Sequence, residues 1–430
     1  MKCVIMAGGR GTRISSIANE IPKPMIKILD KPVLEHALEK LSSQGIKDFI
    51  ITVGYLKEVI MEYFGDGSGF SPATGKPFGV NIEYFEEEKP LGNAGALFCI
   101  KNRLTDDFLL INGDVLFDVD ICRFYSYHQE KRGLVTLFTH PNNHPYDSGI
   151  IVADSNGEVR KWLAKEDERP KYYKNRVNAG LHIISRKVLE QEINKDKIDL
   201  DRDLLKPLAG KGCMYAYDSS EYVKDMGTPE RFVAVNKDCE SGKVENRNLN
   251  KKQKAVFIDR DGTINKYVGF LKHKEEFELL PKVSEAIRKI NCSEYLAIVV
   301  TNQPVIARGE VEIDELEEIH NKMETLLGED GAFVDKIFFC PHHPDKGYEG
   351  ERIEYKIECD CRKPKPGMIL KAAEEFNIDL ASSWMIGDSD NDISAGKAAG
   401  CKTALIGEKE EGQDVTVSCL YEFVELVLKD

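Results

Sequence analysis

Two aspartates stand two residues apart where a run of apolar residues ends. The run 255–258 is followed by Asp259, Arg260, Asp261 and Gly262. Carboxylates with this spacing at the end of a strand can reach one reaction centre, where Asp259 would attack a phosphate ester. Asp261 would then protonate the leaving alcohol and afterwards activate water. The alternative interpretation is a simple turn, because Asp-Gly pairs are common turn formers.

A second group of reactive side chains lies in a loop rich in cysteine and histidine. It contains Cys340, His342, His343, Cys359 and Cys361. Three thiolates and one imidazole suit tetrahedral Zn²⁺, and four protein ligands leave no open position, so this zinc would be structural. A disulfide is disfavoured, because three cysteines leave one unpaired and a cytoplasmic protein keeps its thiols reduced. Unrelated free thiols are the remaining alternative.

Glycine-rich segments near the N-terminus indicate phosphate binding. Gly8 and Gly9 open a loop that also carries Arg13. Glycines let backbone N–H groups approach a phosphate closely, and arginine supplies charge and forked donors. Lys23 follows between two prolines, which hold it in an extended segment. The segment 91–96 is a turn of small residues, where large side chains would block a flat base or ribose. A tight strand-to-helix turn is the alternative for a single segment of this kind.

The hydrophobic pattern predicts two domains that would position these residues. From residue 1 to about 238, short β-branched runs alternate with amphipathic segments, and the same alternation resumes after residue 254. The pattern predicts an α/β fold with two domains, each a mostly parallel sheet flanked by helices. A polar stretch with little to bury separates them. We expect a first domain over 1–240, a linker over 241–253 and a second domain over 254–430.

The first half resembles the sugar nucleotidyltransferase family, which has a Rossmann-like fold, in the order of its motifs. After the glycine loop and the Lys23 segment come LGNAGAL at 91–97, NGD at 112–114, NAG at 178–180 and KDMGTPE at 224–230. The family joins a sugar 1-phosphate to a nucleoside triphosphate and releases pyrophosphate. The resemblance implies that Arg13 and Lys23 neutralise the triphosphate and the transition state. It also implies Mg²⁺ ligands, Asp114 and Asp225, and substrate-binding residues: Gly8, Gly9, Gly92, Asn93 and Asn178, the last facing the sugar.

Two of these residues also have simpler interpretations. Asp114 alone would be a helix cap or a turn residue, and Asn178 alone would form a turn with its neighbours. The family usually carries Glu-Lys-Pro before the Asn-Ala-Gly motif. The corresponding segment here is 163–167, in which Lys165 is the candidate for that lysine.

The second half resembles the haloacid-dehalogenase superfamily of Mg²⁺-dependent phosphatases, another Rossmann-like fold, over about residues 254–407. Its motifs are the Asp259–Asp261 pair, the strand ending at Thr301, a lysine before a helix and the acidic strand end at 387–392. The resemblance makes Asp259 the nucleophile and Asp261 the acid/base. It implies a Mg²⁺ site of Asp259, Asp261 and Asp388, with Asp392 behind it. The implied phosphate- and substrate-binding residues are Thr301, Asn302, Arg308, Arg362 and Lys363.

Within this superfamily, the motifs CPHHP and CDCRKPKPG resemble the branch of heptose bisphosphate and histidinol phosphate phosphatases. That branch has no large cap domain and carries a zinc loop. Its Cys-Pro-His order favours His342 over His343, so the implied zinc ligands are Cys340, His342, Cys359 and Cys361. Because Cys361 directly precedes Arg362 and Lys363, a metal at Cys361 would fix where those cations point.

One motif departs from the branch pattern. Residues 303–306 read Gln-Pro-Val-Ile, where the branch usually has Gln-Ser-Gly-Ile. Proline removes one backbone donor from a loop near the substrate, so details of the substrate are expected to differ.

The two resemblances together imply consecutive reactions. A heptose 1,7-bisphosphate phosphatase would release the heptose 1-phosphate that the first half would activate. The fusion resembles bacterial bifunctional enzymes that make GDP-D-glycero-α-D-manno-heptose, and the preference for GTP comes from that resemblance alone. The alternatives are a hexose-1-phosphate nucleotidyltransferase fused to a phosphatase of another metabolite such as histidinol phosphate, or a zinc-stabilised binding protein with decayed sites. The second is disfavoured because all the candidate acids are present.

Composition excludes other classes of function. The formal net charge is −14, which argues against binding a nucleic-acid backbone, although phosphorylated small molecules need only local positive charge. No apolar run approaches the roughly 18 residues that a membrane span needs. The N-terminal apolar stretch is too short for a signal peptide, so we expect a cytoplasmic enzyme. A homo-oligomer is compatible with these observations.

Overall fold

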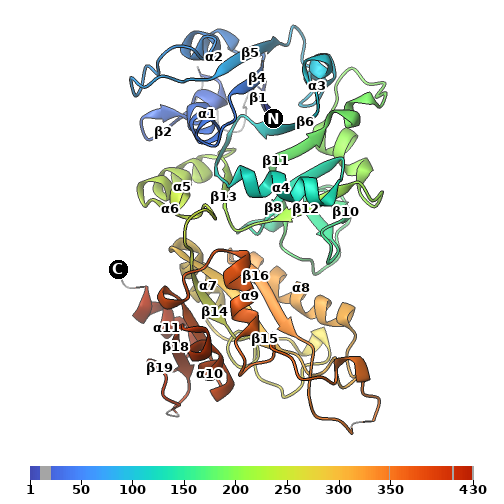
Figure 1. The fold of residues 1–430 in the computed structure, drawn as a ribbon, viewed down its shortest axis with the longest axis vertical. Helices are drawn as coiled ribbons and strands as arrows, with labels where there is room; N and C mark the ends of the chain where they lie inside the picture. Colours follow the sequence, from blue (N-terminus) through green and yellow to red (C-terminus); the bar gives the residue numbers. More distant parts are fainter. Residues whose placement is uncertain (10–20, 348, 409–410, 429–430) are drawn as a thin grey trace. The chain divides into compact units, whose positions relative to one another are not determined.

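The computed structural model describes residues 1–9, 21–347, 349–408 and 411–428 and divides into two compact units (Figure 1). Unit 1 consists of Met1–Thr139, Ile151–Leu163 and Asn178–Asn248, and unit 2 of His140–Ile150, Ala164–Val177 and Leu249–Asp430. The change of unit at residue 248 falls inside the predicted linker, and the exact domain limits stay a prediction. Among the described residues, no helix combines the length and the apolar character that a membrane crossing requires.

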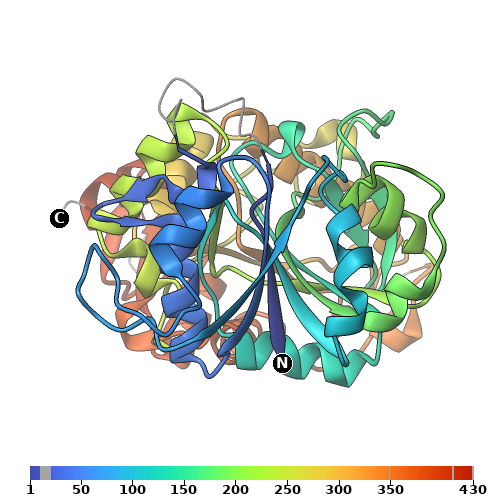
Figure 2. The same ribbon diagram turned by 90° about the horizontal axis from the view of Figure 1, so that it is seen from above.

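The centre of unit 1 is a parallel sheet. β1 (Lys2–Met6) lies between β4 (Asp48–Val53) and β6 (Asp107–Asn112), and β5 (Asn81–Glu86) extends the sheet beyond β4, all in parallel. Figure 2 shows β1 in the middle of the sheet with helices to both sides. Strands covered on both faces are apolar along most of their length, as β1, β4 and β6 are, whereas β5 at the edge is partly polar and exposed. Three helices share the main apolar core with them: α1 (Val33–Ser43), α2 (Lys57–Phe64) and α4 (Ile121–Lys131).

One side of this sheet is antiparallel. β11 (Val177–Ser185) pairs antiparallel with β6 and with β9 (Ile150–Ala153). The sheet continues from β9 to β10 (Val159–Leu163), while β8 (Val135–His140) pairs with β11 and, in parallel, with β12 (Met214–Asp218). Antiparallel neighbours need no crossover helix. The helix-strand alternation therefore predicts the parallel part well and does not show this side.

A small ribbon and short helices complete unit 1. β7 (Val115–Asp118) and β13 (Tyr222–Asp225) pair antiparallel, and the register sets Asp225 opposite Val115. α3 (Gly95–Ile100) begins within the LGNAGAL motif, and α5 (Pro229–Glu240) follows β13. α6 (Lys243–Asn246) lies in the segment predicted as a linker, where Val244 is buried in an apolar cluster with Met226.

Unit 2 contains a six-stranded parallel sheet in the order β16-β15-β14-β17-β18-β19. The strands are β14 (Lys254–Ile258), β15 (Tyr295–Asn302), β16 (Lys336–Cys340), β17 (Trp384–Gly387), β18 (Lys402–Ile406) and β19 (Val415–Val417). The helices are α7 (Val283–Cys292), α8 (Ile313–Glu329), α9 (Gly367–Glu375), α10 (Asp390–Ala399) and α11 (Leu420–Val427). The strand order changes direction at β14, the first strand, and polar residues follow the carboxyl ends of the strands next to it, where α/β sheets bind their ligands. The predicted α/β class with mostly parallel sheets is therefore confirmed.

Candidate active sites and metal centre

Unit 1 has a cleft of about 870 Å³ at the carboxyl ends of β1, β4 and β6. Because these strands are parallel, the residues that follow them meet at one edge of the sheet. The cleft is lined by Met6, Ala7, Gly8, Gly9, Lys23, Pro24, Thr52, Gly54, Tyr55, Glu87, Glu88, Pro90, Gly92, Asn93, Asn112, Asp114 and Lys197. Six residues predicted from the sequence are among them: Gly8, Gly9, Lys23, Gly92, Asn93 and Asp114.

Lys23 and Asp114 meet in this cleft. The Lys23 ammonium lies 3.0 Å from Asp114 Oδ2. Asp225 is not one of the lining residues. Its carboxylate accepts hydrogen bonds from the Arg231 guanidinium at 2.8 and 2.9 Å, so as a Mg²⁺ ligand it would share its oxygens with Arg231. Arg13 lies outside the described residues, and its role stays a prediction.

The turn at Gly92 is fixed by a segment a hundred residues later in the chain. Gly92 has a φ of +81°, and a Cβ atom at this position would lie 2.3 Å from the Ile198 carbonyl oxygen, so only glycine fits. Ile198 donates its N–H to the Leu91 carbonyl at 2.8 Å and accepts from the Ala94 N–H at 3.0 Å. Asn93 accepts from the Leu200 N–H at 2.7 Å. The two segments therefore form one wall of the cleft.

Two further predicted residues are not among those that line the cleft. The Asn178 amide donates to Asp201 Oδ1 at 3.4 Å. Lys165, the candidate for the family's lysine, is exposed and paired with Asp147. Lys197 lines the cleft instead. Lys197 could not be predicted from the sequence, because its place in the cleft follows from the hydrogen bonds that its neighbour Ile198 makes with Leu91 and Ala94.

Glu87 is a second residue that sequence reasoning missed. It follows β5, is half-buried and lines the cleft. Its Oε2 accepts from the Leu91 N–H at 3.3 Å, and its Oε1 lies 2.7 Å from where a Cβ atom at Gly8 would be. Burial raises the pKa of Glu87, and among the described residues no cation pairs with it. In the sequence it stands within three consecutive glutamates, which looks like a solvated charge run.

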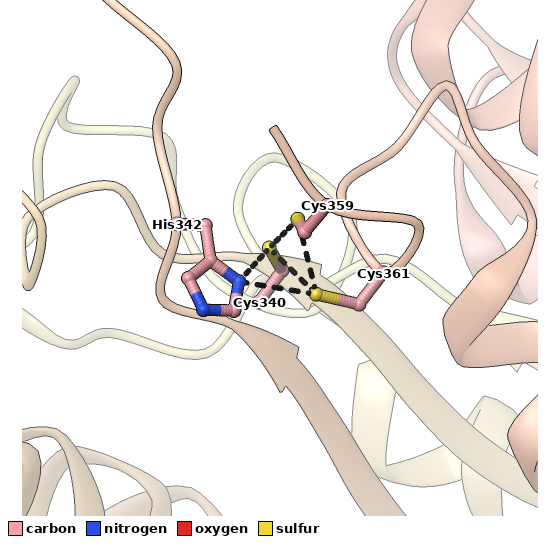
Figure 3. A group of neighbouring side chains, drawn as sticks. All are labelled: Cys340, His342, Cys359 and Cys361. Carbon is pink, nitrogen blue, oxygen red and sulfur yellow. Dashed lines mark hydrogen bonds between the residues drawn. The ribbon is translucent and has the colours of Figure 1, made fainter. Parts of the chain in front are cut away.

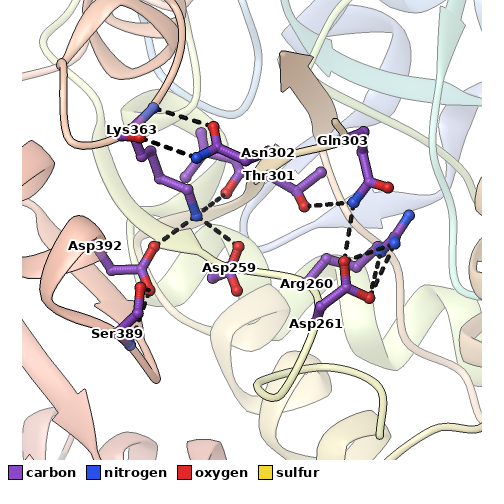
Figure 4. A network of polar contacts seen from close by, with 10 residues as sticks. Asp259, Arg260, Asp261, Thr301, Asn302, Gln303, Lys363, Ser389 and Asp392 are labelled. Atoms are coloured by element: carbon purple, nitrogen blue, oxygen red, sulfur yellow. Dashed lines mark hydrogen bonds and ion pairs between the residues drawn. The ribbon is translucent and has the colours of Figure 1, made fainter. Parts of the chain in front are cut away.

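The second site is centred on the buried Lys363. Its ammonium contacts Asp259 Oδ1 and Asp392 Oδ1, both at 2.5 Å, and donates to the Val300 carbonyl at 2.9 Å (Figure 4). Asn302 at the end of β15 fixes the lysine backbone, donating to its carbonyl and accepting from its N–H, both at 3.0 Å. The structure thus brings together residues that are more than a hundred positions apart.

Three carboxylates at this site could hold a cation. Oxygens of Asp259, Asp388 and Asp392 lie within 4.8 Å of one another. Gly262, with a φ of +86°, leaves room for Asp388, since a Cβ atom there would lie 2.0 Å from Asp388 Oδ2. Hard carboxylate oxygens are what Mg²⁺ prefers. Burial raises the pKa of Asp259, and the Lys363 ammonium opposes that rise.

The Asp261 carboxylate lies outside this group and has its own network. It accepts hydrogen bonds from Arg260, from Asn265 at 3.0 Å and from Gln303 at 2.9 Å. Burial alone would raise its pKa, but the Arg260 charge and these donors lower it. The structure thus places Asp392, predicted to stand behind the metal, within the carboxylate group, and Asp261 beside it.

The remaining predicted substrate residues lie around these groups. The Thr301 hydroxyl is buried at the end of β15 and accepts from Gln303 at 3.0 Å. The Arg308 guanidinium lies over the Phe270 ring, 4.0 Å from its centroid. Arg362 donates to the His342 carbonyl at 3.2 Å. Contact with a substrate stays a prediction for all three.

The predicted zinc ligands form one compact group (Figure 3). The Cys340–Cys359, Cys340–Cys361 and Cys359–Cys361 sulfurs are 3.5, 3.2 and 3.3 Å apart, and His342 Nδ1 lies 3.7 and 3.3 Å from the sulfurs of Cys340 and Cys361. A zinc tetrahedron with bonds of about 2.3 Å to sulfur and 2.0 Å to nitrogen has edges of roughly 3.5 to 3.8 Å. The donor set fits Zn²⁺ in type and nearly in size.

His343 lies outside this group. Its Nδ1 accepts the Asp345 N–H at 3.2 Å. The four-residue group therefore contains His342, the histidine that the Cys-Pro-His order favoured.

Comparison with known proteins finds a matching family for each half of the chain. Residues 2–242 match the family model "Nucleotidyl transferase", and residues 360–416 match "HAD-hydrolase-like". The chain is 38% identical to D-glycero-beta-D-manno-heptose-1,7-bisphosphate 7-phosphatase of Haemophilus ducreyi, over 41% of this chain and 98% of that one. It is 40% identical to the alpha-anomer phosphatase of Burkholderia mallei, over 36% of this chain and 80% of that one.

The first half has a relative of its own. It is 31% identical to mannose-1-phosphate guanylyltransferase of Mycobacterium tuberculosis, over 56% of this chain and 64% of that one, slightly less than two thirds of the relative's length. The chain belongs to the nucleotidyl transferase family through residues 2–242 and, through its second half, to the haloacid-dehalogenase-type phosphatases related to the heptose bisphosphate enzymes.

Proposed function

We propose that this chain is a bifunctional enzyme of nucleotide-activated heptose synthesis. Its second half removes the 7-phosphate of heptose 1,7-bisphosphate, and its first half transfers GMP from GTP to the resulting heptose 1-phosphate and releases pyrophosphate. The observation that supports this most directly is the Lys363 junction with Asp259 and Asp392, in a half related over nearly its whole length to a heptose bisphosphate phosphatase.

The phosphatase reaction has two steps. An Asp259 oxygen forms a bond to phosphorus while the bond from phosphorus to the sugar oxygen breaks, and that oxygen takes a proton from the Asp261 carboxyl. The pKa of Asp261 is lowered in the free site, so the carboxyl takes up this proton when the anionic phosphate binds beside it and opposes its ionisation. Water then attacks the phosphorus and gives a proton to Asp261, and inorganic phosphate leaves Asp259. Lys363 neutralises the anionic phosphate. Mg²⁺, held by Asp259 and Asp388 beside Asp392, would supply further positive charge.

In the first half, Lys23 faces the triphosphate, and Asp114 with Asp225 would bind Mg²⁺. An oxygen of the sugar phosphate attacks the α-phosphorus, and pyrophosphate leaves. Most of the acceleration in such a reaction comes from positioning and from neutralising charge. Lys197 lines the cleft and adds a second cation there, whereas Lys165 is not a lining residue and pairs with Asp147.

The choice of GTP is supported by Glu87. Guanine presents two adjacent donors, N1–H and the 2-amino group, and an ionised carboxylate offers only acceptors. Adenine, cytosine and uracil do not present two neighbouring donors on one edge. A half-buried carboxylate without a cationic partner among the described residues therefore favours guanine.

The metal in the cysteine loop is proposed to be Zn²⁺, bound by Cys340, His342, Cys359 and Cys361. Its support is the fit of donor type and spacing given above. Such a closed site would hold the loop that ends at Lys363, in a structural and not a chemical role. The cytoplasmic location stays a prediction.

The test is a substrate panel on the whole chain. Phosphate release is measured with α and β anomers of heptose 1,7-bisphosphate, and pyrophosphate release with heptose 1-phosphate or mannose 1-phosphate and each of GTP, ATP, CTP and UTP. Mannose 1-phosphate is included because of the first half's relative. The proposal expects heptose substrates and GTP to be used best. Absence of both activities at millimolar substrate would refute it.

A further inference from the structure

Arg260, the residue between the two reactive aspartates, has no part in the chemistry described above. Its side chain is fully buried. One terminal nitrogen donates to both oxygens of the Asp261 carboxylate, at 2.9 and 2.7 Å, and Nε donates to Oδ1 at 3.3 Å (Figure 4). This bidentate geometry fixes the plane of a carboxylate as well as its distance. A buried guanidinium also needs an anion, and Asp261 supplies it.

The other end of this guanidinium is held by a helix. The second terminal nitrogen of Arg260 lies 3.3 Å from His320 Nε2, on the buried face of α8. Arginine can only donate, so Nε2 is the acceptor and the ring proton sits on Nδ1. The His320 ring in turn lies near Phe339 of β16, with centroids 5.8 Å apart. Thus α8 and β16 set where the guanidinium lies.

The backbone of Arg260 is also fixed. Its carbonyl accepts the N–H groups of Ile264 at 2.8 Å and Asn265 at 3.1 Å. Asn265 and Gln303 each donate one further hydrogen bond to the Asp261 carboxylate. Arg260 is therefore the charged member of the group that orients Asp261, and it is held at both ends.

We propose that Arg260, anchored by His320, is the positioning residue that aims the Asp261 carboxyl at the leaving-group oxygen. The inference rests on the acid/base role proposed for Asp261. Proton transfer to a leaving group depends on distance and direction, and small misplacements are costly. A purely structural Arg260–Asp261 pair would instead support the fold and affect every substrate alike.

Leaving-group dependence separates these possibilities. A sugar alkoxide leaves poorly and needs its proton, whereas p-nitrophenolate leaves well without one. Because Asp261 also accepts a proton from water in the second step, which both substrates share, the experiment measures the first step alone, as the single-turnover rate of alcohol release, together with KM. It compares heptose 1,7-bisphosphate and p-nitrophenyl phosphate in His320→Leu, which removes the acceptor, and in His320→Gln, which retains one. Arg260→Met is a second way to remove the contact. Met323→Ala is the control, because Met323 is a buried residue of α8 that belongs to the apolar core.

We expect His320→Leu to lower the single-turnover rate of sugar release roughly 10- to 100-fold, with KM and the single-turnover rate of p-nitrophenolate release changed less than about threefold. His320→Gln should recover most of the loss, and Met323→Ala should show no dependence on the leaving group. Equal effects on both substrates in the His320 and Arg260 variants would overturn the positioning role.

An Asp261→Asn variant, measured in parallel, distinguishes failure of the positioning role of Arg260 from failure of the acid/base role of Asp261. If Asp261→Asn is selective for the sugar phosphate while the His320 and Arg260 variants are not, only the positioning role fails. If Asp261→Asn lowers the rate of the first step equally with both substrates, the acid role at the leaving group fails, and the positioning role with it. Wild-type inactivity on the heptose substrate alone would point to a wrong sugar, and the comparison would then use the sugar phosphate that is hydrolysed.

Discussion

Replacing Glu87 by glutamine should weaken the preference for GTP without disturbing the cleft. Glutamine has the same length and can keep the hydrogen bond from the Leu91 N–H, which at 3.3 Å is a weak contact. It loses the charge and turns an NH₂ group toward a guanine donor. A hydrogen bond to a charged group contributes about 1.5 to 3 kcal/mol. The loss of one such bond plus a donor–donor mismatch therefore amounts to about 3 kcal/mol.

That free energy corresponds to a decrease of roughly 100-fold in kcat/KM for GTP. The rates with ATP and UTP should change little. ITP sharpens the test, because inosine lacks the 2-amino group and keeps N1–H. The wild-type enzyme should favour GTP over ITP by roughly 10- to 100-fold, and Glu87→Gln should nearly abolish that difference. The assay is pyrophosphate release with heptose 1-phosphate under matched conditions.

Glu88→Gln is the matched control, since Glu88 also lines the cleft but is exposed. It should leave the ratio of GTP to ITP unchanged. If Glu87→Gln lowers all nucleotides equally, or leaves the GTP to ITP ratio as in the wild type, Glu87 does not read the base.

Three further changes test other parts of the structure. Asp259→Asn should lower phosphate release on the order of 10⁴-fold or more, since it removes the nucleophile, and should spare nucleotidyl transfer; loss of both activities would contradict independent sites. Cys361→Ser should lower both zinc content and phosphatase activity at least about tenfold, measured by metal analysis beside kinetics, whereas full activity in a zinc-free preparation would exclude the supporting role. His182 on β11 is fully buried, and its pKa is lowered to about 4 by burial. The unfolded chain therefore binds a proton first as the pH falls below about 6.5, and the free energy of unfolding should drop by about 2 kcal/mol between pH 7 and pH 5. Denaturant unfolding of His182→Phe should show a decrease smaller by about that amount, and equal decreases in both proteins would contradict the explanation.

The parts of the fold predicted best from the sequence are those governed by local periodicity. The parallel strands β1, β4 and β6 and five of the six strands of unit 2 begin and end close to the apolar runs, whereas the three-residue strand β19 was not predicted. The antiparallel side around β11 was missed, because strand direction depends on pairing between distant segments. The polar stretch at 241–253 gave no sign that Val244 of α6 would be buried.

The structure brings together the residues predicted as one metal site: Cys340, His342, Cys359 and Cys361. The three cysteines and a histidine were recognised by their donor chemistry, and the choice of His342 over His343 came from the resemblance to the phosphatase branch. Glu87 and Lys197 were missed, since a glutamate in an acidic run and a lysine in a polar loop look solvated. Their place in the cleft arises from contacts across the sheet and with the Gly92 turn, which periodicity does not encode.

The contact between Gly92 and Ile198 constrains how such an enzyme can change over evolution. The turn and the later segment are joined by backbone hydrogen bonds, and the space between them is closed to any side chain at position 92. An insertion or deletion just before Ile198 would shift the wall that carries Asn93 and Lys197. New nucleotide or sugar preferences should therefore arise through paired changes in both segments, and a graft of either one alone from a relative should fail.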